Sequence, residues 1–139
     1  MELTSAQKNE LRDIADRYGL SLAVLFGSTA TGTTHKHSDI DIAVKAKKAL
    51  TLAGEANLSS EFGRLFSRSD VEIVNLAHVQ PLLAKEIAVN GKVLFEESPQ
   101  LFSYFQIGAI RAYLDAGLIF RLKRQQLKDF LSTPYVSHT

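Results

Sequence analysis

The sequence predicts an α/β (α+β) fold, in which helices pack on a small mixed β-sheet and a long C-terminal helical segment follows. Short apolar runs typical of strands alternate with longer patterns typical of helices. The chain has 139 residues, enough for one hydrophobic core and too few for two of ordinary size. It contains no internal repeat and no low-complexity segment. We expect one small domain over residues 1–96 and a helical extension over residues 97–139.

The first elements expected are a helix and a buried strand. Apolar residues between Leu3 and Tyr18 recur at near-helical spacing, Thr4 or Ser5 suits the N-cap, and Gly19 suits the stop. Residues 20–26 form a nearly continuous apolar run that is too short for a typical helix, so we expect a strand there.

The remaining elements alternate between strands and helices. Pro81 fits the first turn of a helix, Asn90 and Gly91 indicate a turn, and Gly108 and Gly117 interrupt the last helical pattern. A short helix is also possible from Ser28, before the second strand. We expect strand, helix, strand, helix, strand and long helix, in that order, over residues 39–44, 49–66, 71–76, 81–88, 92–95 and 99–131.

Charge and composition exclude several classes of protein. Lys and Arg number 16 and Asp and Glu 15, a net charge of +1 that argues against coating nucleic acid, so we expect no direct nucleic-acid binding. The chain has no Cys, which excludes disulfides, thiolate catalysis and Cys-based zinc sites. Its start is polar, and no apolar run approaches the ~20 residues of a membrane span. We expect a cytoplasmic protein without a membrane partner.

Two acidic residues alternate with two apolar residues in the second expected strand. Side chains alternate across a strand, so Asp39 and Asp41 lie on one face and Ile40 and Ile42 on the other. Two carboxylates placed in this way repel each other, and a hard cation such as Mg²⁺ would relieve the repulsion. Taken alone, the pair is better explained by an exposed strand face with two solvated carboxylates.

Two neighbouring features point to the same kind of site. Gly27 and Ser28 lie where a buried strand ends and a helix can begin, a place that favours phosphate, although a plain turn explains them alone. Glu72 lies between apolar residues of the third strand, where a carboxylate is costly unless exposed, paired or bound to metal. If the third strand adjoins the second, Glu72 completes a cluster of three carboxylates. Asp70, at the start of that strand, is its rival.

These residues carry a resemblance to a known family. Ten residues separate Ser28 from Asp39, so residues 27–44 fit the pattern GSx10DxD and resemble the nucleotidyltransferase signature of the DNA polymerase β superfamily. Residues 70–96 resemble the second half of a minimal nucleotidyltransferase (MNT) domain. The resemblance covers roughly residues 20–96, and within the superfamily the chain most resembles the MntA antitoxins of HepT–MntA (HEPN/MNT) toxin–antitoxin pairs.

The resemblance implies a fold, a reaction and a partner. The fold would be that of polymerase β-like nucleotidyltransferases. The reaction would be Mg²⁺-dependent transfer of AMP from ATP to a tyrosine of a HEPN-domain ribonuclease toxin, which neutralises the toxin in a type VII-like pair and releases pyrophosphate. The resemblance further implies that Gly27 and Ser28 bind the ATP triphosphate and that Asp39, Asp41 and Glu72 are the catalytic ligands of two Mg²⁺ ions.

The sequence departs from the family pattern at two places. Glu72 stands where the family usually has a third Asp, and it is one methylene longer. Thr31 stands where many relatives carry an Arg, so a phosphate contact is either missing or supplied from elsewhere. His35, Lys36 and His37 lie in the same loop and are candidates to supply it, although loop histidines are more often simply solvated.

The C-terminal segment suggests a partner surface. Residues 98–139 carry five Lys or Arg against two acids, a local charge of +3, and their helical pattern is apolar on nearly all sides. Such a helix usually seeks a second surface. We expect its large apolar residues to be partly core and partly interface, the alternative being that all pack on the sheet; they are Phe102, Phe105, Tyr113, Leu118 and Phe120.

Two other functions compete with the antitoxin hypothesis. The chain could be a nucleotidyltransferase acting on a small molecule such as an aminoglycoside, or on RNA ends, although it has little room for its own acceptor-binding domain. It could instead be a non-catalytic antitoxin that neutralises its partner by contact. The presence together of the Gly-Ser turn, both aspartates and an acidic residue at position 72 favours catalysis.

Overall fold

The computed structural model describes residues 2–27 and 39–133. The expected helices and strands within these ranges are present, and the helix considered from Ser28 lies outside the described residues. In chain order the elements are α1 (Ser5–Tyr18), β1 (Leu20–Phe26), β2 (Ile40–Ala46), α3 (Leu52–Phe66), β3 (Val71–Asn75), the 3-10 turn η1 (Leu76–His78), α4 (Pro81–Asn90), β4 (Lys92–Glu96) and α5 (Leu101–Ser132).

The four described strands form one mixed sheet in the order β3-β2-β1-β4. The central strand β1 pairs antiparallel with both β2 and β4, whereas β2 pairs parallel with β3. A parallel pair needs a crossover connection, and α3 is the element that makes it. The predicted mixed sheet with helices is therefore confirmed.

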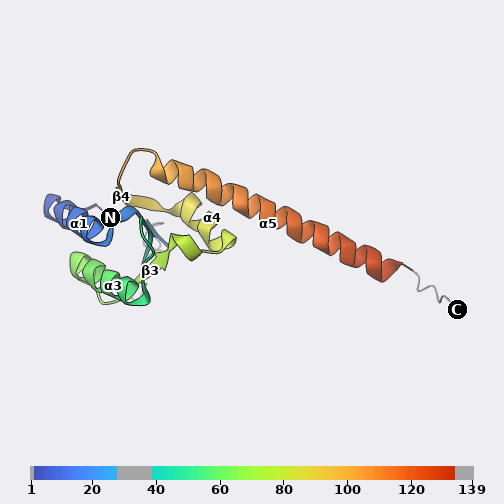
Figure 1. Ribbon diagram of the computed structural model, residues 1–139, viewed down its shortest axis with the longest axis horizontal. Coiled ribbons are helices and arrows are strands. Elements are labelled where there is room, and N and C mark those ends of the chain that lie inside the picture. The colour runs from blue at the N-terminus through green and yellow to red at the C-terminus, as the bar shows by residue number, and fades with distance from the viewer. Residues whose placement is uncertain (1, 28–38, 134–139) are drawn as a thin grey trace.

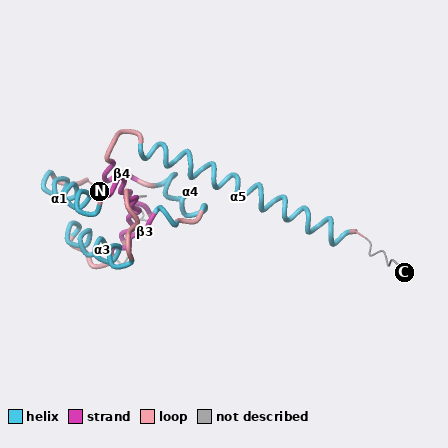
Figure 2. Tube along the Cα trace, viewed as in Figure 1, coloured by secondary structure: helices cyan, strands magenta, loops and turns pink. Residues whose placement is uncertain are grey.

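Helices cover both faces of the sheet (Figures 1 and 2). Helices α1 and α3 pack on one face, where Ile14, Ile42 and Phe62 are fully buried. Helix α4 and the first turns of α5 pack on the other face, against a second cluster that includes Val24 and Ile87. No helix in the described part of the chain is both long enough and apolar enough to span a membrane.

The ends of α1 follow from its capping residues. The Thr4 side chain accepts a hydrogen bond from the backbone N–H of Gln7, and the Gln7 side chain accepts one from the backbone N–H of Thr4. Gly19 ends the helix in the left-handed conformation at φ 64°, which costs glycine little. Thr4 is therefore the cap, and Ser5 is the first helical residue.

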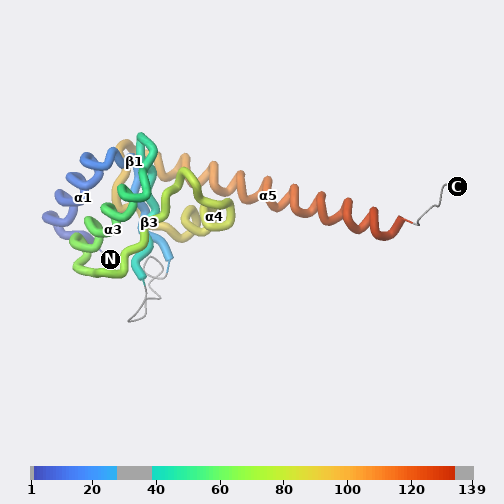
Figure 3. Tube along the Cα trace, turned by 60° about the horizontal axis from the view of Figure 1, so that its bottom comes forward, coloured from blue at the N-terminus to red at the C-terminus, as the bar shows by residue number. Residues whose placement is uncertain are grey.

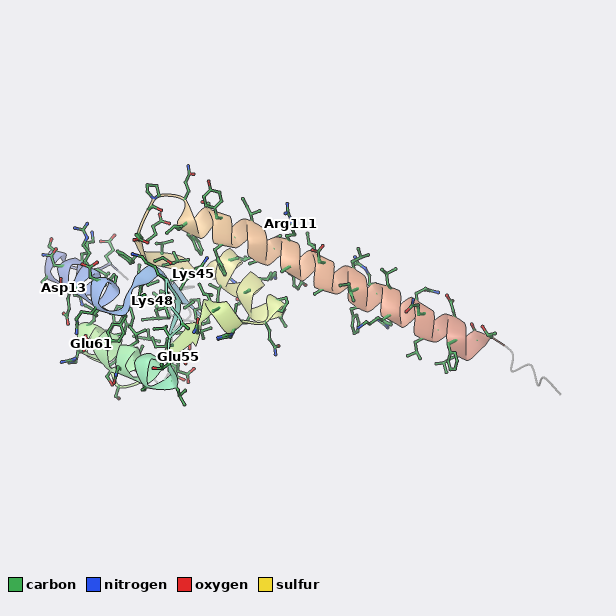
Figure 4. All side chains as sticks on the ribbon, in the orientation of Figure 1. Asp13, Lys45, Lys48, Glu55, Glu61 and Arg111 are labelled. Atoms are coloured by element: carbon green, nitrogen blue, oxygen red, sulfur yellow. The ribbon has the colours of Figure 1, made fainter. Side chains whose placement is uncertain are left out.

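Buried charge also joins α1 to α3. Glu61 of α3 is 9% exposed and is the only charged residue that is buried among residues 2–27 and 39–133. It pairs with Arg17 of α1 at 2.5 Å and with Arg64 one turn further along α3. Figure 4 shows Glu61 on the helix pair that covers this face of the sheet. A buried carboxylate with two cationic partners fixes how the two helices lie against each other.

Two element boundaries differ from the sequence-based prediction for local reasons. Helix α3 begins at Leu52 rather than at residue 49, because the Thr51 side chain caps it by accepting from the N–H of Gly54 at 2.9 Å. Strand β3 ends at Asn75, whose side chain accepts from the N–H of Ala77 at 2.9 Å and starts η1. In both places a side chain hydrogen-bonded to nearby backbone decides where the element stops.

Helix α5 is continuous through Gly108 and Gly117, where an interruption was predicted. Hydrogen bonds join its first turns to β4 and α4. The N–H of Phe102 donates to Glu96 at 3.1 Å, and the Gln106 side chain donates to the carbonyl of Ala88 at 2.8 Å. A helical glycine costs only about 1 kcal/mol, which the 32-residue helix tolerates twice. The distal half of α5 projects away from the body (Figures 1 and 3).

Gly91, at the end of α4, leaves no room for a side chain between the helix and the sheet. A Cβ atom at this position would lie 2.5 Å from Cγ1 of Val24, whereas a Cβ at Gly108 would meet nothing within 4 Å. We therefore expect Gly91→Ala to lower the free energy of unfolding by about 1–3 kcal/mol through overpacking. Gly108→Ala is the matched control and should leave stability unchanged or raise it by up to about 1 kcal/mol. Urea denaturation measures both, and equal effects would contradict this account.

Candidate active site

Two carboxylates face each other across the parallel strands. The register of β2 and β3 places Asp41 opposite Glu72, and the register of β1 and β2 places Phe26 opposite Asp41. These three side chains therefore form a row across one face of the sheet. Ile40 and Ile42 are fully buried in the core on the other face, so the carboxylates are held toward the α4 side.

The carboxylates interact strongly enough to change protonation. Burial, followed by the negative charges of Glu72 and Asp39 and a hydrogen bond with Glu72, raises the pKa of Asp41 from 3.8 to about 6. Asp41 is half-buried, whereas Asp39 and Glu72 are exposed. The three acidic residues named from the sequence are thus close enough to act on one another, and Asp41 lies at their centre.

Gly27 lies directly against Asp41. Its φ of 79° is in the left-handed region, and a Cβ atom at this position would stand 2.5 Å from Oδ2 of Asp41. Only glycine fits both constraints, so the turn after β1 passes beside the carboxylates. The other turn and loop residues named from the sequence lie outside the described residues; they are Ser28, Thr31, His35, Lys36 and His37.

Asp70 has a different environment from Glu72. The Arg68 guanidinium donates from Nε to Oδ1 of Asp70 at 2.7 Å and from Nη2 to Oδ2, and this hydrogen bonding lowers the pKa of Asp70. The carbonyl of Asp70 accepts from the N–H of Ile40 at 3.0 Å, which begins the β2–β3 ladder. Asp70 therefore forms an ion pair with Arg68 just before β3 begins. Glu72 is the acidic residue opposite Asp41.

Arg68 is a neighbour of the site that the sequence reasoning missed. Hydrogen bonding to Asp70 is the main cause that raises the pKa of Arg68, and the negative charge of Asp39 adds to it. Helix α3 ends at Ser67 in the left-handed conformation, and the N–H of Arg68 then donates to the carbonyl of Gly63 at 2.8 Å. The available signal was an arginine two residues before an aspartate, directly after a helix. The Arg68 side chain therefore brings a positive charge close to the acidic cluster.

The donor chemistry of the cluster fits a hard cation. Carboxylate oxygens are the ligands that Mg²⁺ prefers, and repulsion among adjacent carboxylates is what a cation relieves. Within residues 2–27 and 39–133, no three acidic or imidazole side chains stand ready-made around a single ion position. The Asp41–Glu72 pair is the part of the acidic cluster that the register of the sheet itself builds.

Comparisons with known proteins identify the family of this chain. The sequence matches the family described as "Polymerase beta, Nucleotidyltransferase" over residues 9–100. It is 34% identical to the protein adenylyltransferase MntA of Aphanizomenon flos-aquae, over 81% of each chain. The chain belongs to the MntA protein adenylyltransferases of the polymerase β nucleotidyltransferase family. The family recognised from the signature residues is thereby confirmed.

Solved structures of similar fold come from toxin–antitoxin complexes. A chain in a crystal structure of a toxin–antitoxin with AMP-PNP is 27% identical, with a TM-score of 0.69 covering 91% of this chain and 98% of that one. A chain in a structure of the tri-AMPylated Shewanella oneidensis HEPN toxin in complex with MNT antitoxin is 24% identical, with a TM-score of 0.64 covering 92% and 98%, and it shares the fold. The nucleotidyltransferase fold with a long C-terminal helix is therefore confirmed for this MntA-family chain.

The raised pKa of Asp41 predicts how stability depends on pH without metal. Because the folded pKa of about 6 exceeds 3.8, folding favours the protonated acid, and this contribution is lost as pH rises from about 4 to 6. We expect Asp41→Asn to raise the melting temperature of metal-free protein at pH 7.5 and to change it little at pH 4. Asp13→Asn, an exposed change on α1, should do neither. Equal shifts at both pH values would contradict the assignment.

Proposed function

We propose that this chain is the antitoxin of a toxin–antitoxin pair and neutralises a HEPN-type ribonuclease toxin by transferring AMP from ATP to a tyrosine of the toxin. The observation that carries the proposal is the carboxylate pair Asp41 and Glu72, with Asp39 beside it and Gly27 against it, in a chain of the MntA adenylyltransferase family. Both ATP and the RNA that a ribonuclease attacks are cytoplasmic, so we place the pair in the cytoplasm.

The turn after β1 would hold the triphosphate of ATP. Gly27 has the positive φ that lets a backbone pass close to a ligand, and it contacts the acid at the centre of the cluster. Ser28 follows it and offers a hydroxyl donor to a phosphate oxygen. The phosphates would then lie between this turn and the carboxylates.

Asp39, Asp41 and Glu72 would hold two Mg²⁺ ions. When bound, these ions neutralise the charge on the phosphates and favour the ionised form of the attacking group. The raised pKa of Asp41 supports this role, because a carboxylate that repels its neighbours is stabilised by a cation. Glu72 lies on β3, on the far side of Asp41 from the phosphate turn, and so we assign it to the nucleophile.

The reaction is an in-line displacement at the α-phosphorus. The tyrosine oxygen forms a bond to this phosphorus. At the same time the bond between this phosphorus and the oxygen that bridges it to the β-phosphate breaks, and pyrophosphate leaves. A tyrosine hydroxyl titrates near ~10, so its proton must be removed at neutral pH. We assign the acceptance of that proton to the carboxylate of Glu72, which is exposed.

The distribution of burial along α5 supports a division of the chain into two parts. We propose residues 1–96 as the nucleotidyltransferase domain and residues 97–139 as the partner-binding extension. Phe102 and Phe105 are partly buried against the sheet and α4, whereas Leu118 is 49% and Phe120 63% exposed. Phe102 and Phe105 match the expected core part, and the interface role of the exposed residues stays a prediction. Tyr113 is also exposed and lies under the ammonium of Lys85 of α4.

Co-expression with the toxin tests the transfer reaction. Each AMP added should raise the intact mass of the toxin by about 329 Da. We expect Asp39→Ala and Asp41→Ala to abolish this gain while circular dichroism stays unchanged, and Asp13→Ala to leave it intact. AMP transfer by the double variant at the wild-type rate would refute the proposal. A wild-type protein that inhibits the toxin without any gain in mass would indicate neutralisation by contact alone.

A second experiment tests the extension. We expect Leu118→Glu combined with Phe120→Glu to reduce recovery of the toxin in a pull-down by at least about tenfold, since a charged group would be buried in the interface. Helicity should not fall, because both side chains are exposed in the free protein. Lys8→Glu, an exposed change on α1, is the control. Full recovery of the toxin by the double variant would rule out this part of α5 as the binding surface.

A further inference from the structure

We propose that the groove along the β3 edge of the sheet receives the acceptor segment of the partner protein, a tyrosine with basic side chains beside it. The groove has a volume of about 740 Å³ and is lined by the end of β3, by η1 and by the first turns of α4. This inference rests on the proposed function and identifies the surface that would select the acceptor.

The groove begins at Val74, two residues along β3 from Glu72, and Glu72 itself does not line it. Val74 lines it and lies two residues after Glu72 on the same face of β3, which corresponds to about 7 Å along a strand. Strand β3 is at the edge of the sheet, so no further described strand separates the groove from the carboxylates. A side chain lying in the groove can therefore point its end group at Glu72.

The groove is also on the correct side for an in-line attack. Across the sheet, the order is the Gly27 turn after β1, then Asp41 on β2, then Glu72 on β3. If the pyrophosphate leaves toward the Gly27 turn, the nucleophile must arrive from the opposite side. That side is the β3 edge, where the groove lies.

The lining fits a phenol better than a charged or small polar group. Val74, Val79, Leu82 and Leu83 form apolar walls, and Leu82 remains 68% exposed in the free protein. The aromatic ring of a tyrosine would cover this apolar surface and leave its hydroxyl in the solvent-exposed end of the groove, toward Glu72.

Acidic residues at the rim indicate the charge of the acceptor segment. Glu55 and Glu86 both line the groove, from α3 and α4 respectively, and Glu72 lies just beyond its end. Figure 4 shows Glu55 at the end of α3 nearest to η1. Complementary charge steers a partner and fixes its register, so we infer Lys or Arg beside the tyrosine.

Kinetics with the purified HEPN-type toxin test the groove. We expect Leu82→Arg to raise the KM for the toxin by about tenfold or more, because the new charge repels a basic segment and fills the groove. The affinity for AMP-PNP with Mg²⁺, measured by calorimetry, should stay within about twofold of wild type. Glu86→Lys, an exposed change that alters charge alone, should also raise the KM.

Val93→Arg is the matched control, since Val93 is 40% exposed on β4 at the opposite edge of the sheet, and it should change neither quantity. A wild-type KM for both groove variants would overturn the groove proposal alone. An equal fall in AMP-PNP affinity would overturn it as well, because the groove would then hold the nucleotide base. If the wild-type protein transfers no AMP to the toxin, the proposed function itself fails, and the groove proposal fails with it.

Discussion

The parallel pairing of β2 with β3 is the constraint on which the site depends. It places Asp41 directly opposite Glu72, an arrangement that electrostatic repulsion alone would disfavour. The register is held from the other face, where Ile40 and Ile42 are fully buried. A slip of one residue would turn these isoleucines toward the α4 side and the carboxylates into the hydrophobic layer under α1 and α3, so that layer enforces the position of the acids.

The repulsion between these carboxylates, which suits the site to a cation, also destabilises the folded protein when they are ionised. The acid at the centre, Asp41, takes up a proton at higher pH than a free carboxyl does, which means that its ionised form is disfavoured in the folded protein. A cation or a proton relieves the same repulsion, and the two therefore compete for the cluster. The structure tolerates this repulsion because it lies at the end of well-packed strands. Under the proposed function, bound nucleotide and metal would relieve it.

Alternation and apolar runs were sufficient to predict the strands, the mixed sheet and the two faces of β2. These patterns could not distinguish Asp70 from Glu72. Both residues are acidic, and they are two positions apart, a spacing that puts side chains on the same face of a strand. That choice depends on register, and on Arg68 being positioned by the left-handed turn at Ser67 to pair with Asp70. Such a turn at a residue other than glycine has no reliable sequence signal. The limit of the folded body along α5 was equally hidden, because its apolar pattern does not change where the contacts stop.

The two proposed contact surfaces lie on the same side of the molecule. Helix α5 runs beside α4, with Ala84, Ala88 and Ala109 allowing the two helices to approach closely, and then continues outward on the α4 side of the sheet (Figures 1 and 3). The acceptor groove is lined by the opposite end of α4. A partner held along the distal half of α5 would therefore be kept near the groove, and tethering raises the effective concentration of a weakly bound segment. On these two proposals, affinity for the partner would come from the helix, and only the orientation of the tyrosine would be left to the groove.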